Sequence, residues 1–328
     1  MKRVATALAI TALVGAVAFP VLATRVTWQN TAILMLMTAQ LGVAWNILGG
    51  YAGQVSLGHA AFFGAGAYVS TLLSIRLGVS PWVGMGAGAM VSAALGVLVG
   101  WPCFRLKGHY FAMATIAVGE IVQTLVNGSD RLGGAVGFTL PLVEAGFWGF
   151  VFNRSKLPYY YIALGLLLAT VLVNWAVNRS HVGYYLRAIK DEPDAARSLG
   201  VSLTRYKMIA MVLSAGLTAM GGTLYAQKEL FIDPGSTLST SLSIKIALVA
   251  ILGGAGRLWG PVLGAVVLTA IEEASRIAFG GTGRGTDLVV YGLLLVVIAV
   301  FQPAGIVGLF QRRPARAAPP AEPEGASP

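Results

Sequence analysis

Charged residues are scarce in this sequence, at 11% of 328 positions, whereas an ordinary soluble domain carries about 25%. Hydrophobic residues instead make up 56%, and the mean hydropathy is +0.74. This balance excludes a typical soluble protein and predicts one polytopic transmembrane domain. The 42 glycines agree with that prediction, because helices in lipid approach one another closely through small residues.

Cysteine and histidine are also scarce, and their scarcity excludes several kinds of site. The single cysteine, Cys103, cannot form an intrachain disulfide. The histidines, His59, His109 and His181, are scattered and give no metal-ligand cluster. The phosphate-binding pattern G-x-x-x-x-G-K-[ST] is missing, as is a Ser-His-Asp order. The sequence therefore predicts no catalytic residues, no metal, no cofactor and no ATP site in this chain.

Apolar runs of about 20 residues, the length at which a helix crosses a bilayer, recur along the chain. They predict an all-α transmembrane bundle with about eight to ten spans. The run at 241–254 is short, so it is either a half-helix, a re-entrant segment or a tight crossing. The runs lie near 4–23, 30–49, 57–76, 82–101, 108–126, 158–178, 206–227, 241–254, 261–279 and 287–302.

The first run also resembles a secretory signal peptide, because a basic start precedes an apolar stretch with small residues near its end. An uncleaved first helix is the plainer interpretation, since the rest of the chain is itself membrane-spanning.

The net charge of +10 does not gather in one basic domain, so it does not indicate nucleic-acid binding. Lys and Arg instead occupy the loops, and the inner loops hold about twice as many as the outer loops if the chain starts in the cytoplasm. Both termini are therefore expected to be cytoplasmic. The expected divisions are a first helix with a short outer loop over 1–29, a transmembrane domain over 30–310, and a disordered cytoplasmic tail over 311–328. The outer loop at 127–157 is expected to form a structured cap.

The loop at 179–206 is too long and too polar for a simple linker between two helices. Within it, Pro193 suits the first position of a helix, Asp194 favours the positive end of its dipole, and Gly200 is a natural stop. A helix of about two turns is not stable alone in water, so it needs a surface to dock on. Ala195, Ala196 and Leu199 offer an apolar face for that. The alternative is an amphipathic surface loop held by this chain's own helix ends.

Two glycine-rich segments share Ile-Leu-Gly-Gly before a further glycine, "NILGGYAG" at 46–53 and "AILGGAGRLWG" at 250–260. Transporters place such broken segments in corresponding halves, where unwound backbone faces a water-filled path. The alternative is a pair of tight turns. After the first segment, Gln54 is expected to line or gate a pathway, and Ser56 to cap the following helix.

Ionisable groups inside spans are costly in lipid and usually face protein or water. Glu120 and Lys245 are such groups, and their opposite charge suggests a pair. Glu272 and Arg276 stand four positions apart and are expected to pair on one helix face. The pathway and gating candidates are Gly50, Gly53, Gln54, Ser56, His59, Glu120, Lys245, Gly253 and Gly254.

Five blocks of the sequence resemble the permeases of branched-chain amino-acid ABC importers, of the LivM type. They occur in the family's order from about residue 30 to 310, and the loop at 127–157 and the tail match least. The blocks read "NILGGYAGQVSLGHAAFFGAGAY", "LKGHYFAMATIAVGEIVQ", "LRAIKDEPDAARSLGVSLTRYKMIAMVLSAGLTAMGGTLYA", "ILGGAGRLWGPVLGA" and "YGLLLVVIAVFQPAGIVGL".

The resemblance implies a multi-pass subunit of the bacterial inner membrane. A second permease subunit would complete the pore as a heterodimer, and a periplasmic binding protein would deliver the substrate. Two cytoplasmic ATP-binding subunits would bind ATP and Mg and drive transport. In such importers a short cytoplasmic helix docks on the ATPase. By position the implied coupling residues are Glu192, Pro193, Asp194, Ala195, Ala196, Arg197, Leu199 and Gly200.

The expected function is thus ATP-driven import of a branched-chain or related hydrophobic amino acid. Within the same family, permeases for urea, short amides or aromatic acids would show the same blocks. A protein of another class, a stand-alone secondary transporter or channel, would work without ATPase subunits. A membrane enzyme fits worst, because no nucleophile, base and metal occur together.

Overall fold

The computed structural model describes residues 15–20, 25–106, 108–140, 146–152 and 156–279, together with 289, 292 and 293. Within them, seven helical segments are long and apolar enough to cross a membrane. The expected polytopic helical fold is therefore confirmed, and the chain is a multi-pass membrane protein. The expected spans 4–23 and 287–302 and the tail 311–328 lie wholly or mostly outside the described residues.

The helices begin and end close to the expected spans. The long helices are α2 (Val26–Asn46), α3 (His59–Leu77), α4 (Pro81–Cys103), α5 (His109–Asn127), α6 (Leu157–Arg179), α9 (Leu203–Glu229), α11 (Thr240–Gly254) and α12 (Gly260–Phe279). The shorter elements are the π-helical turn η1 (Ile47–Tyr51), the 3-10 turn η2 (Asp130–Leu132), α7 (His181–Asp191), α8 (Pro193–Ser198), α10 (Pro234–Thr237), β1 (Phe138–Thr139) and β2 (Phe231–Ile232).

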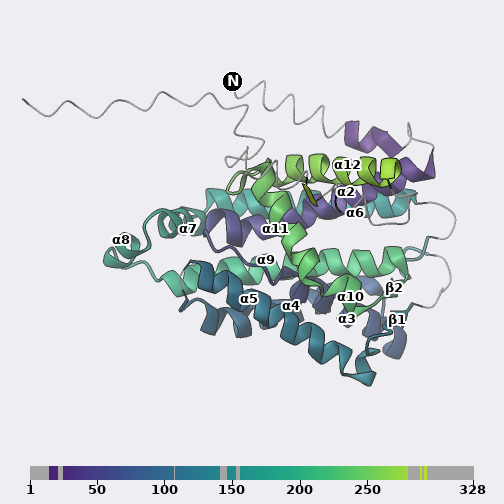
Figure 1. Ribbon diagram of the computed structural model, residues 1–328, viewed down its shortest axis with the longest axis horizontal. Helices are drawn as coiled ribbons and strands as arrows, with labels where there is room; N and C mark the ends of the chain where they lie inside the picture. Colours follow the sequence, from purple (N-terminus) through teal and green to yellow (C-terminus); the bar gives the residue numbers. More distant parts are fainter. Residues whose placement is uncertain are drawn as a thin grey trace, which may run out of the picture.

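The bundle has two ends with different structures (Figure 1). At one, α7 and α8 project beyond the long helices; we call it the α7–α8 end. At the other, β1 and β2 form a short antiparallel pair in which Phe138 faces Ile232, and we call it the β end. Strand β1 belongs to the loop at 127–157, so the described part of that loop is structured, as expected. Its place as a cap on the outer side stays a prediction.

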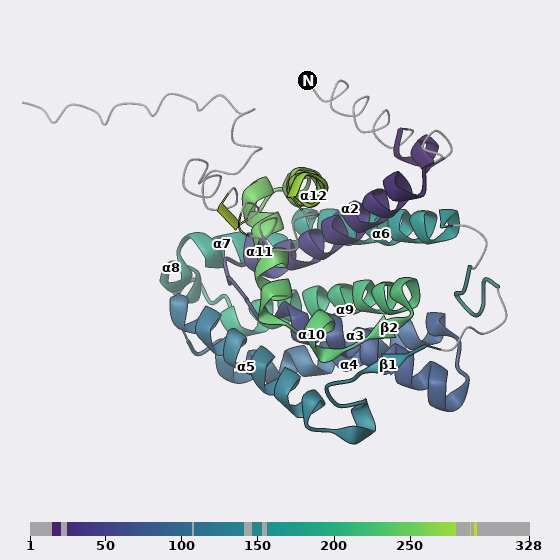
Figure 2. The ribbon, with the colours of Figure 1, turned by 45° about the vertical axis from the view of Figure 1, so that its right-hand side comes forward.

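Helix α9 lies at the centre of the bundle. It packs on α3 and α4 on one side and on α2, which in turn packs on α6, on the other (Figure 2). Glycines bring α3 and α9 into backbone contact: a Cβ on Gly222 would lie 1.9 Å from the Phe63 carbonyl oxygen, and one on Gly66 would lie 2.1 Å from that of Ala219. Such contact is how helices associate in lipid, where no hydrophobic force holds them together.

Helices α11 and α12 form a second glycine-packed pair beside α2. A Cβ on Gly253 would lie 1.8 Å from the Gly260 carbonyl oxygen, and one on Gly264 would lie 2.0 Å from that of Val249. The structure shows how the short apolar run at 241–254 is extended to the length of a span. Helix α10 precedes α11 after a break, and together Pro234–Gly254 makes a 21-residue segment long enough to cross.

Candidate functional site: the glycine junction and the charged face

The polar loop at 179–206 folds into two helices, α7 and α8. As expected, Pro193 occupies the first turn of α8, and Gly200 follows its end with a positive φ of 83° that favours glycine. Helix α7 was not predicted. The spacing of Val182, Leu186 and Ile189 is helical and could have indicated it, since Leu186 and Ile189 are buried against the bundle.

Helix α8 does not present the single apolar face expected of Ala195, Ala196 and Leu199. Ala196 is 5% exposed and faces this chain, whereas Leu199 is 85% exposed. Ala195 is also exposed. The expectation for Ala196 is therefore corrected: it anchors α8 to its own bundle. The free surface of α8 and its flanks consists of the exposed residues Glu192, Asp194, Ala195, Arg197, Ser198, Leu199 and Gly200, beside the partly exposed Pro193.

The last turn of α7 contacts the first glycine-rich segment. The Lys190 ammonium donates a hydrogen bond to the Gly50 carbonyl oxygen at 3.0 Å. Gly53 has φ 66°, and a Cβ there would lie 2.9 Å from Lys190 Cγ. Gly50 is buried in the π-turn η1. The loop at 179–206 is thus hydrogen-bonded directly to the broken end of α2.

The second glycine-rich segment meets the first at the same place. Asn46 Oδ1 accepts a hydrogen bond from the Gly256 backbone N–H at 2.7 Å, and Asn46 Nδ2 donates to the Arg257 carbonyl at 3.1 Å. A Cβ on Gly256 would lie 3.1 Å from the Gly50 oxygen and 3.3 Å from Lys190 Nζ. We call Asn46, Gly50, Gly53, Lys190 and Gly256 the glycine junction. Sequence alone gave no sign that the two segments touch.

Gly253 and Gly254 lie next to the glycine junction, at the turn from α11 to α12. Gly253 lets the two helices touch, and Gly254 has φ 117°, which favours glycine strongly. Both are in the interior of this chain.

Between η1 and α3 the chain is non-helical, and a buried polar chain supports it. His59 contacts the Ser56 hydroxyl at 3.1 Å through Nδ1 and the Ser214 hydroxyl at 2.8 Å through Nε2. Ser214 donates in turn to the Ala44 carbonyl at 2.8 Å. His59 and Ser56 are fully buried, so they satisfy the interior of this broken segment.

The structure contradicts the role expected of Ser56 but does not test the role expected of Gln54. Gly58 holds the N-cap position of α3, with no side-chain cap, so the capping role expected of Ser56 is wrong. Gln54 donates to the Ala52 carbonyl at 3.4 Å and is partly exposed beside the glycine junction. Its role in gating stays a prediction.

Both expected ion pairs are wrong. Lys245 on α11 pairs with Glu272 on α12, with 2.6 Å between Nζ and Oε2. Arg276 pairs with Glu273, three positions before it, rather than with Glu272. Glu120 on α5 instead accepts a hydrogen bond from the Thr240 hydroxyl at the start of α11. Glu120, Lys245 and Glu272 thus have partners on neighbouring helices, and Arg276 has one on its own helix.

These groups form one charged face over α5, α11 and α12, which lie along one side of the bundle (Figures 1 and 2). Glu120 is exposed, and the side chains of Lys245 and Glu272 are 31% and 40% exposed. Charges at the centre of a helix cost about 2.5–3.5 kcal/mol in lipid. This face is therefore suited to protein or water rather than to acyl chains.

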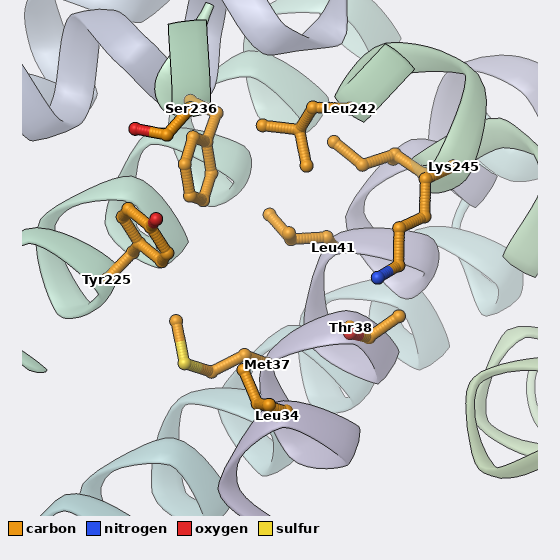
Figure 3. Close-up of a pocket in the computed structure, with 10 residues that line it drawn as sticks. Leu34, Met37, Thr38, Leu41, Tyr225, Ser236, Leu242 and Lys245 are labelled. Carbon is orange, nitrogen blue, oxygen red and sulfur yellow. The ribbon is translucent and has the colours of Figure 1, made fainter. Parts of the chain in front are cut away.

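A cavity of about 120 Å³ opens beside the break between α10 and α11 (Figure 3). Its walls come from α2, α3, α9, α10 and α11. Of its lining, only Lys245 was expected, because the other residues are ordinary core types until five helices bring them together. They include Leu34, Met37, Leu41, Tyr225, Ser236 and Leu242. No group of metal-ligating side chains occurs among the described residues.

Comparison with known proteins gives one family for most of the chain. Residues 27–299 match the model of a family described as "Branched-chain amino acid transport system / permease component". The high-affinity branched-chain amino acid transport system permease protein LivM of Salmonella typhimurium is 30% identical over 318 residues, which cover 90% of this chain and 73% of that protein. LivM of Escherichia coli is 30% identical over 317 residues, with the same coverage.

This chain is also similar, over a shorter length, to a permease that is named for a different substrate. The autoinducer 2 import system permease protein LsrC of Klebsiella pneumoniae is 31% identical over 189 residues, 56% of this chain and 52% of that protein.

Proposed function

This chain belongs to the family of permease components of branched-chain amino acid transport systems, and from that premise we propose how it works. It is a membrane subunit of an ABC transporter and not the ATPase. We propose that it forms half of the translocation pathway of an importer for branched-chain amino acids in the bacterial inner membrane. It couples that pathway to ATP hydrolysis through α8.

One observation carries the coupling proposal: α8 projects from the bundle while α7, which leads into it, is bonded to the pathway helices. Leu199 is 85% exposed and is the large apolar side chain on the free surface of α8, so we propose that it enters the contact with an ATP-binding subunit. Lys190 meanwhile holds Gly50 at the glycine junction, close to Gly256 at the end of α11. A force on α8 would therefore be transmitted through α7 to the glycine junction, where the helical structure of α2 and of α11 is interrupted.

The charged face supports the proposal of a second permease subunit. Glu120, Lys245 and Glu272 lie within the lengths of α5, α11 and α12, and they are exposed or partly exposed in the isolated chain. A second permease, with a water-filled path between the two, would keep these charges out of lipid. Two ATP-binding subunits at the α7–α8 end and a periplasmic binding protein at the β end complete the proposed importer. ATP and Mg are bound by the partner subunits.

The choice of branched-chain amino acids rests on the LivM relatives, which cover most of this chain. The similarity to LsrC shows that related permeases are named for other substrates. Urea, short amides and aromatic acids remain the alternatives. The identity of the binding protein encoded beside this chain, and its measured affinities for these compounds, would distinguish them.

The test is ATP-driven uptake by the complete complex in proteoliposomes, with the binding protein and radiolabelled leucine outside. We expect Leu199→Asp to lower uptake at least about tenfold, because a charge would enter the centre of an apolar contact. Leu199→Met is the matched control and should keep uptake. Uptake at the wild-type rate by Leu199→Asp would contradict coupling through α8. Uptake by this chain without ATPase subunits would instead support a secondary transporter or channel.

A further inference from the structure

We propose that the cavity beside the α10–α11 break is a transient binding site for a zwitterionic amino acid with a branched aliphatic side chain. Lys245 and Glu272 would bind its carboxylate and its ammonium group. This inference rests on the proposed function and adds to it the residues that meet the substrate inside the permease.

The walls of the cavity match an aliphatic side chain. In Figure 3, Leu41 lies behind the open space, with Tyr225 and Met37 on one side and Leu242 and Lys245 on the other. The volume of about 120 Å³ is slightly below that of an engineered apolar cavity of about 150 Å³ that admits benzene. A four-carbon side chain fits such a space.

The polar groups at the cavity are few, which selects against sugar-like ligands. Thr38, Tyr225 and Ser236 carry its hydroxyls, and Lys245 carries its charge. A carbohydrate would bring many hydroxyls, and burying each one without a hydrogen-bond partner is unfavourable. The cavity therefore favours an amino acid over a carbohydrate.

Lys245 lines the cavity, and its ammonium pairs with Glu272 on α12, so an opposite charge lies next to the charge at the cavity wall. The pair spans 2.6 Å and is only partly buried, so both groups are accessible. A zwitterion can insert between them, with its carboxylate on the Lys245 ammonium and its own ammonium on the Glu272 carboxylate. Each charge keeps an opposite partner throughout, so the exchange avoids an uncompensated charge at membrane depth.

The same reasoning predicts which ligands fail. Leucinamide lacks the carboxylate and 4-methylpentanoate lacks the ammonium group, so either one would leave one protein charge unpaired. Removing one member of an ion pair costs more than removing both, because the remaining charge loses its partner. Both compounds should therefore bind much more weakly than leucine, although each has the same four-carbon side chain.

The experiment places a cysteine at Leu242 in the complete complex in nanodiscs, without binding protein. Cys103 is buried and does not compete for reagent. The rate of maleimide labelling is measured with and without leucine. For a site with a Kd of about 1 mM, leucine at about 10 mM occupies about nine sites in ten and slows labelling about tenfold. Leucinamide and 4-methylpentanoate should not slow it.

Variants separate binding from folding. Lys245→Met should abolish protection by leucine without stopping labelling, and Lys245→Arg should retain most of the protection. A cysteine at Val136, an exposed position in the loop before β1, should be labelled at one rate with or without leucine. Equal protection by leucine and leucinamide, or no protection by either, would overturn the proposal.

ATP-driven leucine uptake is measured on the same preparation. Uptake without protection refutes this site and leaves the proposed function standing. If leucine neither protects nor is taken up, while another substrate of the family is, both proposals fail.

Discussion

Lys190 is the residue on which the coupling proposal depends most directly. Its ammonium satisfies the buried Gly50 carbonyl, and its stem fills the space left by Gly53. A methionine would keep the stem and remove only the hydrogen bond. An unpaired buried carbonyl costs about 1–3 kcal/mol, which is enough to loosen the glycine junction without unfolding the bundle.

We therefore expect the complex that carries Lys190→Met to hydrolyse ATP at near the wild-type rate, while its rate of leucine uptake falls severalfold. Both rates are measured in the same proteoliposomes. Arg205→Met is the matched control, because Arg205 is another exposed cation at the α7–α8 end. Parallel loss of hydrolysis and uptake would show that Lys190 serves assembly or stability instead of coupling.

At the scale of single residues, the sequence identified the important groups better than their partners. Lys245, Glu120 and the glycines at 50, 53, 253 and 254 all lie at structured contacts, as expected for polar or glycine residues in a span. Their partners could not be predicted, because Lys245 reaches Glu272 on a different helix. Spacing along one helix suggested Arg276 for Glu272, and tertiary packing overrode it.

At the scale of elements, backbone contact between α3 and α9 holds the centre of the bundle. A methyl group at Gly222 would approach the Phe63 carbonyl to 1.9 Å, and neither backbone can yield without separating the helices. Gly165 on α6 is the matched control, since a Cβ there meets nothing within 4 Å.

We expect Gly222→Ala to lower the free energy of unfolding by about 1–3 kcal/mol, as overpacking does. Gly165→Ala should leave stability near the wild-type value. Denaturation of the two purified variants in the same detergent, followed by tryptophan fluorescence, measures the difference. Equal stability of both would contradict the close α3–α9 packing.

Long apolar elements were predictable from sequence, and short polar ones were less so. The hydropathy of α2 to α6 and α9 placed these helices within a few residues, because lipid requires a continuous apolar run. Helix α7 was missed, although its apolar residues recur at helical spacing, because the polar loop was searched for the shorter helix at 193–200 alone. Helix α10 was missed because four residues before a break resemble a turn.

At the scale of the whole molecule, the bundle has one side suited to lipid and one suited to protein or water. Ile244 lies on α11 beside Lys245, and Leu172 lies on α6; they are 41% and 62% exposed. A bimane dye on a cysteine at position 244 should be quenched by aqueous iodide in the assembled complex. The same dye at position 172 should be quenched by a nitroxide-labelled lipid.

The iodide quenching at position 244 should also change when the complex is trapped with ATP, because a translocation path alternates its opening. Lipid quenching at both positions, with no effect of ATP, would place the charged face against the bilayer. Sequence could not predict this two-sidedness. Helices α5 and α11 belong to segments apolar enough to be read as ordinary spans, and the run that forms α12 was expected to be one too. Only the arrangement of the three helices gathers the three charges.

The π-turn at the end of α2 sets the kind of movement that the glycine junction permits. A π-turn holds one residue more than an α-turn, and Ile47–Tyr51 is such a turn. Returning it to α-helical register would rotate the chain beyond it by about 100° and advance it by about 1.5 Å. A pull by Lys190 on Gly50 is therefore expected to switch the turn between two discrete registers. The connection to α3 would then rotate and advance in one step instead of extending gradually.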